Sequence, residues 1–370
     1  MPCVHHAIAQ PAICEVCARD VAGRRRRGTL LVVAAVGLLP IAGGVVYLQT
    51  RPKPPPPPPV EADNVLRLQA EALAQHPCDE KMMRERVERF ATLNRTAEAL
   101  ATAERAVGCG IGGRMPWRLA YLSQQLHQWL VTAVTTTQLI AEQPEDSDFW
   151  WWRADAWIDG KLPRLALFDL RQSLANSDGE QAGGFAAVRF LDAAKPTNEL
   201  CEADRAWRYY VHALGGSPNA DMRDEHAALV RDKTCPVDAG GTIGERVRVT
   251  IGGVAGTFAV DPRIGTTLVS RVFAAKAALE SDPKQLAIGW VRHTTATGWL
   301  PVGQPQLGEP IRLDKVAAGA ASAARVDALV IDELPETGVD GVLGLSFLWH
   351  YAFERTPAGF SLRPLDDKPL

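Results

Sequence analysis

The sequence predicts a multi-domain protein in which a short tail and one transmembrane helix precede an all-α domain and an all-β lobe. Three observations lead to this fold class. One early stretch of the chain carries no charge, and the middle is rich in alanine, leucine, glutamate and arginine without strand-like alternation. The last third alternates apolar and polar residues between glycine turns. The predicted domain boundaries are 1–28, 29–49, 50–61, 62–242 and 243–370.

The length and charge of the chain narrow the possible functions. A chain of 370 residues is long enough for two or three domains. Apolar residues make up 46% of it and charged residues 22%, which is the composition of a globular protein. The net charge is −3, and no stripe of basic and aromatic residues is present, so we expect no nucleic-acid partner.

The tail, residues 1–28, has the spacing of a metal site. Cys3 and His6 are separated by two residues, and so are Cys14 and Cys17. Three thiolates and one imidazole form a tetrahedral zinc set with the short spacing of zinc knuckles, and the tail resembles the first half of B-box-like zinc ribbons. His5 could replace His6, and a disordered tail is the alternative. Because all four ligands come from the protein, the predicted zinc is structural, and no cofactor is predicted for catalysis.

Residues 30–48 predict a membrane anchor within the segment 29–49. Nineteen helical residues rise about 28 Å, close to the ~30 Å core of a bilayer. Four arginines, Arg24 to Arg27, precede the run, whereas only Arg51 and Lys53 follow it closely. The positive-inside rule then places the N-terminus in the cytoplasm, and the alternative of a cleaved signal peptide lacks a small-residue cleavage site. The expected location is a bacterial inner membrane, crossed once, with the C-terminal domains in the periplasm.

The segment 50–61 is dominated by prolines. Such a run favours the extended polyproline II conformation, about 3.1 Å per residue. It predicts a stiff spacer between the membrane and the domains that follow.

The middle segment, 62–242, contains a weak repeat. Alanines recur at intervals of 34 and 33 residues, and tryptophans at an interval of 33: Ala99, Ala133 and Ala166, and Trp117 and Trp150. The spacing of small and bulky residues after Trp150 resembles the tetratricopeptide pattern. This resemblance implies two to four stacked helix hairpins. An ordinary helical bundle is an equal alternative.

Residues 149–152 and Trp157 form an aromatic cluster within this repeat. Four adjacent aromatic side chains on a helix cannot all face one core. Some could line a concave groove for a peptide, but we expect most of them to pack between successive hairpins.

Four cysteines fall in the same segment. Cys78 and Cys109 bracket one predicted helix pair, and Cys201 and Cys235 bracket another. The outer ends of an antiparallel helix hairpin lie side by side, within reach of a disulfide. Three pairings are possible, and the preferred one joins Cys78 to Cys109 and Cys201 to Cys235. Four buried free thiols are the alternative.

The last segment, 243–370, predicts a β-rich lobe. The expected strands are 245–251, 256–261, 287–293, 309–314, 326–332, 351–355 and 359–363, with short helices at 272–279 and 346–350. The first two strands form a hairpin that ends at an acidic residue, Asp261. A side chain at a strand end can face a cleft.

This hairpin and a second motif resemble the retropepsin-like aspartic peptidase family. In that family the hairpin leads into Asp-Thr/Ser-Gly-Ala-Ser/Thr, which aligns without a gap with residues 261–265, Asp-Pro-Arg-Ile-Gly. Residues 339–354 are similar to its closing segment, with Val342, Leu343 and Gly344 before a short helix. The resemblance covers about 245–365. It implies a β lobe in which Asp261 is the catalytic residue.

The resemblance also implies a homodimer through this lobe. Aspartic proteolysis needs two carboxylates that share one proton, so Asp261 must be supplied twice. The residues after it depart from the motif: Pro262 has no hydroxyl and no amide donor, and Arg263 is bulky where the family has glycine. Two hypotheses follow, namely a membrane-anchored aspartic peptidase, or an inactive homologue that binds a protein or peptide through its helical repeats.

Overall fold

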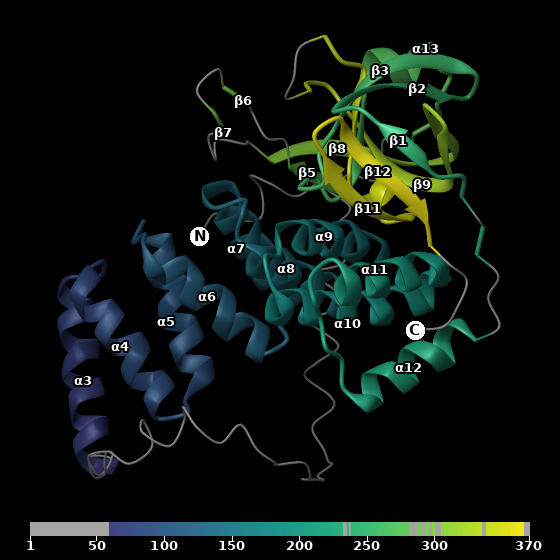
Figure 1. Ribbon diagram of the computed structural model, residues 1–370. Coiled ribbons are helices and arrows are strands. Elements are labelled where there is room, and N and C mark those ends of the chain that lie inside the picture. Colours follow the sequence, from purple (N-terminus) through teal and green to yellow (C-terminus); the bar gives the residue numbers. More distant parts are fainter. Residues whose placement is uncertain are drawn as a thin grey trace. The chain divides into compact units, whose positions relative to one another are not determined.

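The computed structural model describes residues 59–231, 235–236, 238–281, 287–290, 294–295, 298–299, 305–334 and 338–365. The chain divides into two compact units, Met1–Ala62 and Asp63–Leu370. Helices and strands of the second unit are shown in Figure 1, coloured from the purple first helix to the yellow last strands.

Ten helices precede the first strand among the described residues (Figure 1). They are α3 (Pro59–Gln75), α4 (Glu80–Thr92), α5 (Thr96–Gly108), α6 (Arg114–Gln125), α7 (Trp129–Glu142), α8 (Ser147–Asp159), α9 (Pro163–Asn176), α10 (Glu180–Thr197), α11 (Leu200–His212) and α12 (Ala220–Val230). Each from α4 to α11 packs on its neighbours in the chain, which gives four helix hairpins in succession. We call these hairpins the helical array. They agree with the predicted stack of two to four hairpins.

Local sequence explains where several of these helices begin. Asp79 and Asn219 accept hydrogen bonds from backbone amides in the first turns of α4 and α12, at 2.8 and 2.9 Å. Pro163 stands in the first turn of α9, where no amide donor is required. Such caps satisfy donors that the helix itself cannot pair.

The aromatic cluster of α8 packs mainly between hairpins, as expected from the sequence. Phe149, Trp150 and Trp152 are buried, and the Trp150 indole donates to the Pro144 carbonyl at 2.8 Å. Trp151 is only partly buried. These side chains fill the space between α8 and the hairpins beside it.

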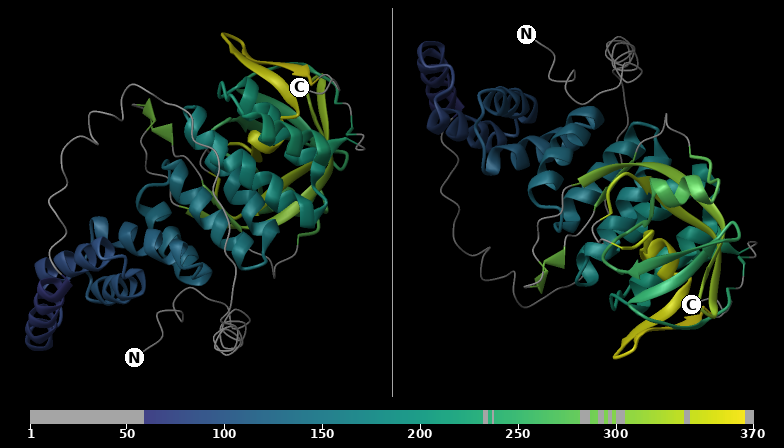
Figure 2. Two further views of the ribbon diagram at one scale, coloured as in Figure 1. Left: turned by 90° about the horizontal axis from the view of Figure 1, so that it is seen from below. Right: turned by 90° about the horizontal axis from the view of Figure 1, so that it is seen from above.

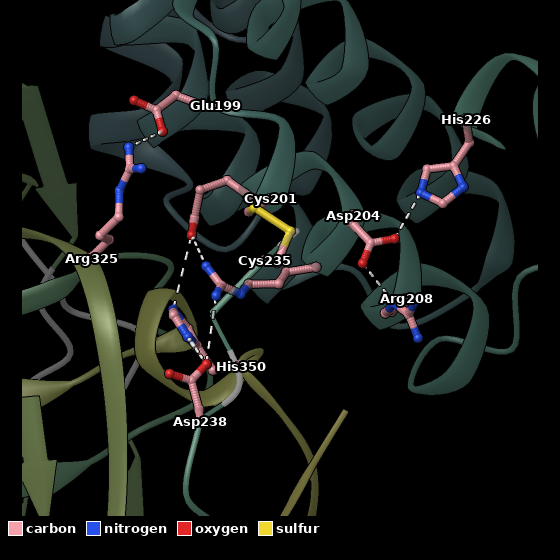
Figure 3. Close-up of a disulfide and its surroundings, with 11 residues drawn as sticks. Glu199, Cys201, Asp204, Arg208, His226, Cys235, Asp238, Arg325 and His350 are labelled. Atoms are coloured by element: carbon pink, nitrogen blue, oxygen red, sulfur yellow. Dashed lines mark hydrogen bonds and ion pairs between the residues drawn. A yellow bond between two sulfur atoms is a disulfide. The ribbon is translucent and has the colours of Figure 1, made fainter. Parts of the chain in front are cut away.

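The four described cysteines form two disulfides, Cys78–Cys109 and Cys201–Cys235. This is the pairing that the sequence favoured. Figure 3 shows the second one beside the ion pairs of α11. A closed loop of this length stabilises the fold by about 4 kcal/mol in the chain-entropy model, and such bonds persist in oxidising compartments.

The β lobe contains twelve strands and two short helices among the described residues. The strands are β1 (Gly241–Ile243), β2 (Arg246–Ile251), β3 (Val254–Val260), β4 (Thr267–Ser270), β5 (Ala287–Trp290), β6 (Thr294–Thr295), β7 (Gly298–Trp299), β8 (Pro305–Ala318), β9 (Ala321–Ile331), β10 (Gly341–Leu343), β11 (Tyr351–Thr356) and β12 (Gly359–Pro364). The helices are α13 (Arg271–Lys276) and α14 (Leu345–Leu348).

One sheet of the lobe closes on itself. Its order is β2-β3-β10-β4-β9-β8-β5, and β2 pairs with β8 as well as with β3. Within this barrel, β10 runs parallel to β3, and β4 runs parallel to β9. A second sheet has the order β1-β12-β11. The two views of Figure 2 show the lobe from opposite sides. The pairing of β2 with β8 closes six strands of the first sheet on themselves and so removes their free edges, while β5 pairs only with β8.

Two predictions about the N-terminal part are contradicted. No helix in the described part of the chain is long and apolar enough to cross a membrane; the longest, α10, has 18 residues, whereas a span needs about 20. The single-pass anchor, and with it the inner-membrane location with periplasmic C-terminal domains, was therefore a wrong prediction. The segment 29–49 lies outside the described residues, as do the tail 1–28 and most of the spacer 50–61.

The predicted zinc cofactor is also contradicted. Across the described ranges, no group of three or more His, Cys, Asp or Glu side chains is placed to hold a metal ion. The described cysteines are joined in disulfides, so their sulfurs are not available as thiolate ligands. The proposed ligands Cys3, His6, Cys14 and Cys17 lie outside the described residues.

Candidate functional site

Asp261 begins the loop 261–266, which connects β3 to β4 and which we call the Asp261 loop. The backbone amide of Asp261 donates to the Leu343 carbonyl at 3.1 Å, which continues the pairing of β3 with β10. The amide of Arg263 donates to Oδ1 of Asp261 at 3.0 Å. One carboxylate oxygen of Asp261 therefore accepts a hydrogen bond within its own turn.

Helix α14 holds the other side of the Asp261 loop. The amides of Leu345 and Ser346 donate to the carbonyls of Ile264 and Gly265, at 2.7 and 2.9 Å. A Cβ on Gly344 would lie 2.5 Å from the Ile264 carbonyl oxygen, so only glycine fits between loop and helix. The closing motif of the sequence is thus in contact with the loop that follows Asp261.

The hydroxyl of Ser346 ties three segments of the lobe together. It lies 2.8 Å from the amide of Thr267 and 3.0 Å from its hydroxyl, and it donates to the Asp327 carbonyl at 2.7 Å. Both hydroxyl side chains are fully buried. This network fixes the start of β4 behind the Asp261 loop.

Helix α9 of the helical array packs against the front of the Asp261 loop. The side-chain amide of Gln172 donates to the Arg263 carbonyl and accepts from the Gly265 amide, both at 2.8 Å. A Cβ on Gly265 would lie only 2.5 Å from the backbone nitrogen of Gln172. Helix and loop are therefore in backbone contact, and Gln172 satisfies one donor and one acceptor of the loop.

A charged cluster joins the helical array to the lobe beside this contact. Arg171 is fully buried and donates to Asp327 of β9 and, at 3.3 Å, to Glu202 of α11. Asp327 also accepts from Arg312 of β8, at 2.6 Å and 2.8 Å. Arg205 donates to Glu202 at 2.6 Å. Burial alone would raise the pKa of Glu202. The charges of Arg205 and Arg171 outweigh this effect, so the pKa lies below its ordinary value.

His350 lies at the lobe end of the same cluster. Its Nδ1 is 2.7 Å from a carboxylate oxygen of Asp238, and Figure 3 shows the pair below the Cys201–Cys235 disulfide. Burial and the nearby Arg205 lower the pKa of His350 from its ordinary value, against the opposing effect of Asp238. His350 therefore lies among the side chains of Asp238, Glu202 and Arg205.

A second candidate site is a groove of about 800 Å³ between helices of the helical array and α12. Its lining comes from α6, α8, α10, α11 and α12: Gln124, Trp151, Asp155, Gly184, Phe185, Val188, Arg189, Tyr210 and Met222. Trp151 and Phe185 are stacked with ring centroids 5.5 Å apart.

One charged pair lies among the apolar side chains of the groove. Asp155 pairs with Arg189 at 2.8 Å and accepts from Gln124 at 3.2 Å. Burial raises the pKa of the Asp155 carboxyl. An apolar groove with a few placed polar groups is typical of a binding site.

The sequence predicted Asp261 at a strand end, and the structure places it directly after β3. Gln172 and Arg171 were missed, although both are buried where the array meets the lobe. A lone glutamine or arginine in a helix gives no signal for such a role. The groove was considered for the aromatic cluster, and one of its members, Trp151, does line it.

Comparisons with known proteins point to the same lobe. Residues 247–347 match a family model described as "Aspartyl protease". The solved structures that match include a retropepsin-like aspartic protease from Rickettsia conorii, at 17% sequence identity and a TM-score of 0.24, covering 35% of this chain and 95% of that one. No curated protein matches the sequence.

Proposed function

Because the C-terminal lobe of this chain is a retropepsin-like aspartic protease lobe, we propose that the protein is a non-catalytic member of that family that binds a protein or peptide. The observation that carries the proposal is the contact that covers the Asp261 loop, together with the residues that follow Asp261. Its front is covered by α9, through Gln172 and Gly265. Pro262 and Arg263 stand where two catalytic loops would have to meet closely.

The chemistry of the family supports this reading. Peptide hydrolysis requires two carboxylates about 3 Å apart that share one proton. A nearby guanidinium such as that of Arg263 favours the ionised form of a carboxyl and opposes the sharing of a proton. The buried Ser346 and Gly344 contacts preserve the shape of the lobe, which a binding module also needs.

The groove of the helical array is the proposed binding surface. Phe185 is 54% exposed at its edge, and Trp151 stacks on it. Exposed aromatic side chains next to a polar pair resemble the anchors of protein–protein interfaces, where a few such residues carry most of the binding energy. Its volume of about 800 Å³ lies within the usual range of ligand-binding clefts.

A cleavage assay tests the absence of catalysis. We expect the full chain to leave an unfolded protein substrate intact from about pH 3, where carboxyls titrate, to about pH 8. The Asp261→Ala variant is the control and should behave identically. Cleavage by the natural chain that disappears in Asp261→Ala would establish the homodimeric peptidase instead. Retention of Asp261 at the end of β3 is the observation that favours this second function.

A peptide array tests the groove. We expect the full chain to retain a subset of arrayed peptides. Phe185→Ala should bind them at least about tenfold more weakly, since truncating an aromatic hot-spot residue costs about 2 kcal/mol or more. Val272→Ala is the matched control, because Val272 is 80% exposed on α13 of the lobe, outside the groove. Equal binding by Phe185→Ala, or no bound peptide at all, would contradict the proposed surface.

A further inference from the structure

The Asp261 loop is the surface on which the family's homodimers depend. If Asp261 is supplied twice, both carboxylates must lie about 3 Å apart, which brings the two loops to the two-fold axis. Any segment that lies against the loop in the same chain therefore competes with a second lobe. In this protein the competing segment is α9.

The contact between α9 and the Asp261 loop is a backbone contact at Gly265, which a second chain could not share. The closest backbone atoms of Arg171 and Gln172 would lie 2.5–2.6 Å from a Cβ at Gly265, well inside van der Waals contact. Gln172 is only 4% exposed, and both ends of its amide are engaged by the loop. Glutamate in its place would lack the donor, and leucine would lack both functions.

An apolar stripe extends the contact along α9. Leu165, Phe168 and Gln172 follow each other at helical spacing, so they lie on one face of the helix. Leu165 and Phe168 pack on a cluster of the lobe formed by Ala259, Ile264, Leu268, Leu329, Ile331 and Val342. This cluster includes residues of β3, β4, β9 and β10 and of the loop itself.

We propose that α9 takes, within one chain, the place that the second lobe occupies in the family's homodimers. Gln172 is the residue that binds the backbone of the Asp261 loop. Docking of the array and pairing of two lobes through this surface then exclude each other. The inference shares the contact of α9 with the proposed lack of catalysis and deepens it, whereas peptide binding in the groove does not depend on it.

Sedimentation velocity of the full chain tests this exclusion. The natural chain should sediment as a monomer. Phe168→Asp places a carboxylate against the apolar cluster, so it should release α9 and strengthen self-association at least about tenfold. Val272→Asp introduces the same charge at a side chain that is 80% exposed on the lobe, and it should leave the mass unchanged.

A crosslinking readout shows which surface is used. Arg263→Cys, in the exposed part of the loop, should form an intermolecular disulfide in the Phe168→Asp background and not in the natural background. Phe168→Asp without Arg263→Cys controls for crosslinks through other cysteines. If the Arg263→Cys variant of the otherwise natural chain were already dimeric and crosslinked through residue 263, the proposal would be overturned. A Phe168→Asp chain that stays monomeric would overturn it as well.

Hydrogen exchange at the Gly265 amide separates the role of Gln172 from general loss of stability. Gln172→Ala removes the acceptor of this amide and should speed its exchange, while amides of β12 remain protected. Gln172→Glu keeps an acceptor oxygen and should preserve most of the protection. Unchanged exchange in Gln172→Ala would exclude Gln172 as the residue that holds the loop. A monomer that fails to bind peptides would leave this inference intact and reject only the proposed groove.

Discussion

Replacement of Asp327 by alanine should lower the free energy of unfolding by about 3–5 kcal/mol, because the buried Arg171 is then left to share Glu202 with Arg205. Asp327 is 6% exposed and accepts from both Arg171 and Arg312. Without it, the fully buried Arg171 retains Glu202 as an ion-pair partner at 3.3 Å. Urea unfolding followed by circular dichroism measures the change.

An exposed ion pair gives the matched control for this prediction. Arg67 and Glu71 are paired at 2.6 Å on the surface of α3, with side chains 61% and 58% exposed. Glu71→Ala should therefore change the free energy of unfolding by less than about 0.5 kcal/mol. If Asp327→Ala proved as mild as Glu71→Ala, the buried cluster would not hold the array against the lobe.

The aromatic rings around Arg171 explain how a guanidinium is accommodated there. Its Nε and Nη1 have no hydrogen-bond partner within the described ranges. The guanidinium carbon lies 5.4–5.7 Å from the ring centroids of Phe168, Phe190 and Trp349. Such cation–π contacts offset part of the cost of desolvation.

Substitution of Gly265 by alanine should lower the free energy of unfolding by about 3 kcal/mol, at the upper end for overpacking of a close contact. The added methyl group would meet backbone atoms of α9, which cannot move aside as a flexible side chain can. Thermal and urea unfolding measure the loss. The backbone amide at position 265 should also exchange faster in this variant, because Gln172 no longer reaches it.

Gly112→Ala is the control for this second change. A Cβ at Gly112 would meet nothing within 4 Å, so the same methyl group should be nearly neutral there. Equal stability of Gly265→Ala and Gly112→Ala would mean that the helix and the loop are not in contact in solution.

Much of the β lobe could be predicted because its strands are long or alternate regularly. The hairpin expected at 245–251 and 256–261 is present as β2 and β3, and the strands expected at 309–314 and 326–332 are the cores of β8 and β9. The short strands β4 and β10 were missed. They have four and three residues and are buried almost throughout, so they show no polar alternation.

The docking of the helical array could not be predicted from the sequence. Charged side chains are normally exposed, so Arg171 reads as part of a solvated helix face. Its partner Asp327 stands 156 residues later, and no local pattern connects them. The membrane and zinc predictions, which are contradicted, depended only on local spacing in residues 1–49.

The order of segments along the chain has a consequence for biosynthesis. The face of α9 that bears Leu165 and Phe168 is made before the strands that cover it. At about 5–20 residues per second, roughly 8–30 s separate the synthesis of Arg171 from that of Asp327. During this interval the apolar face of α9 in a nascent chain has no covering strand.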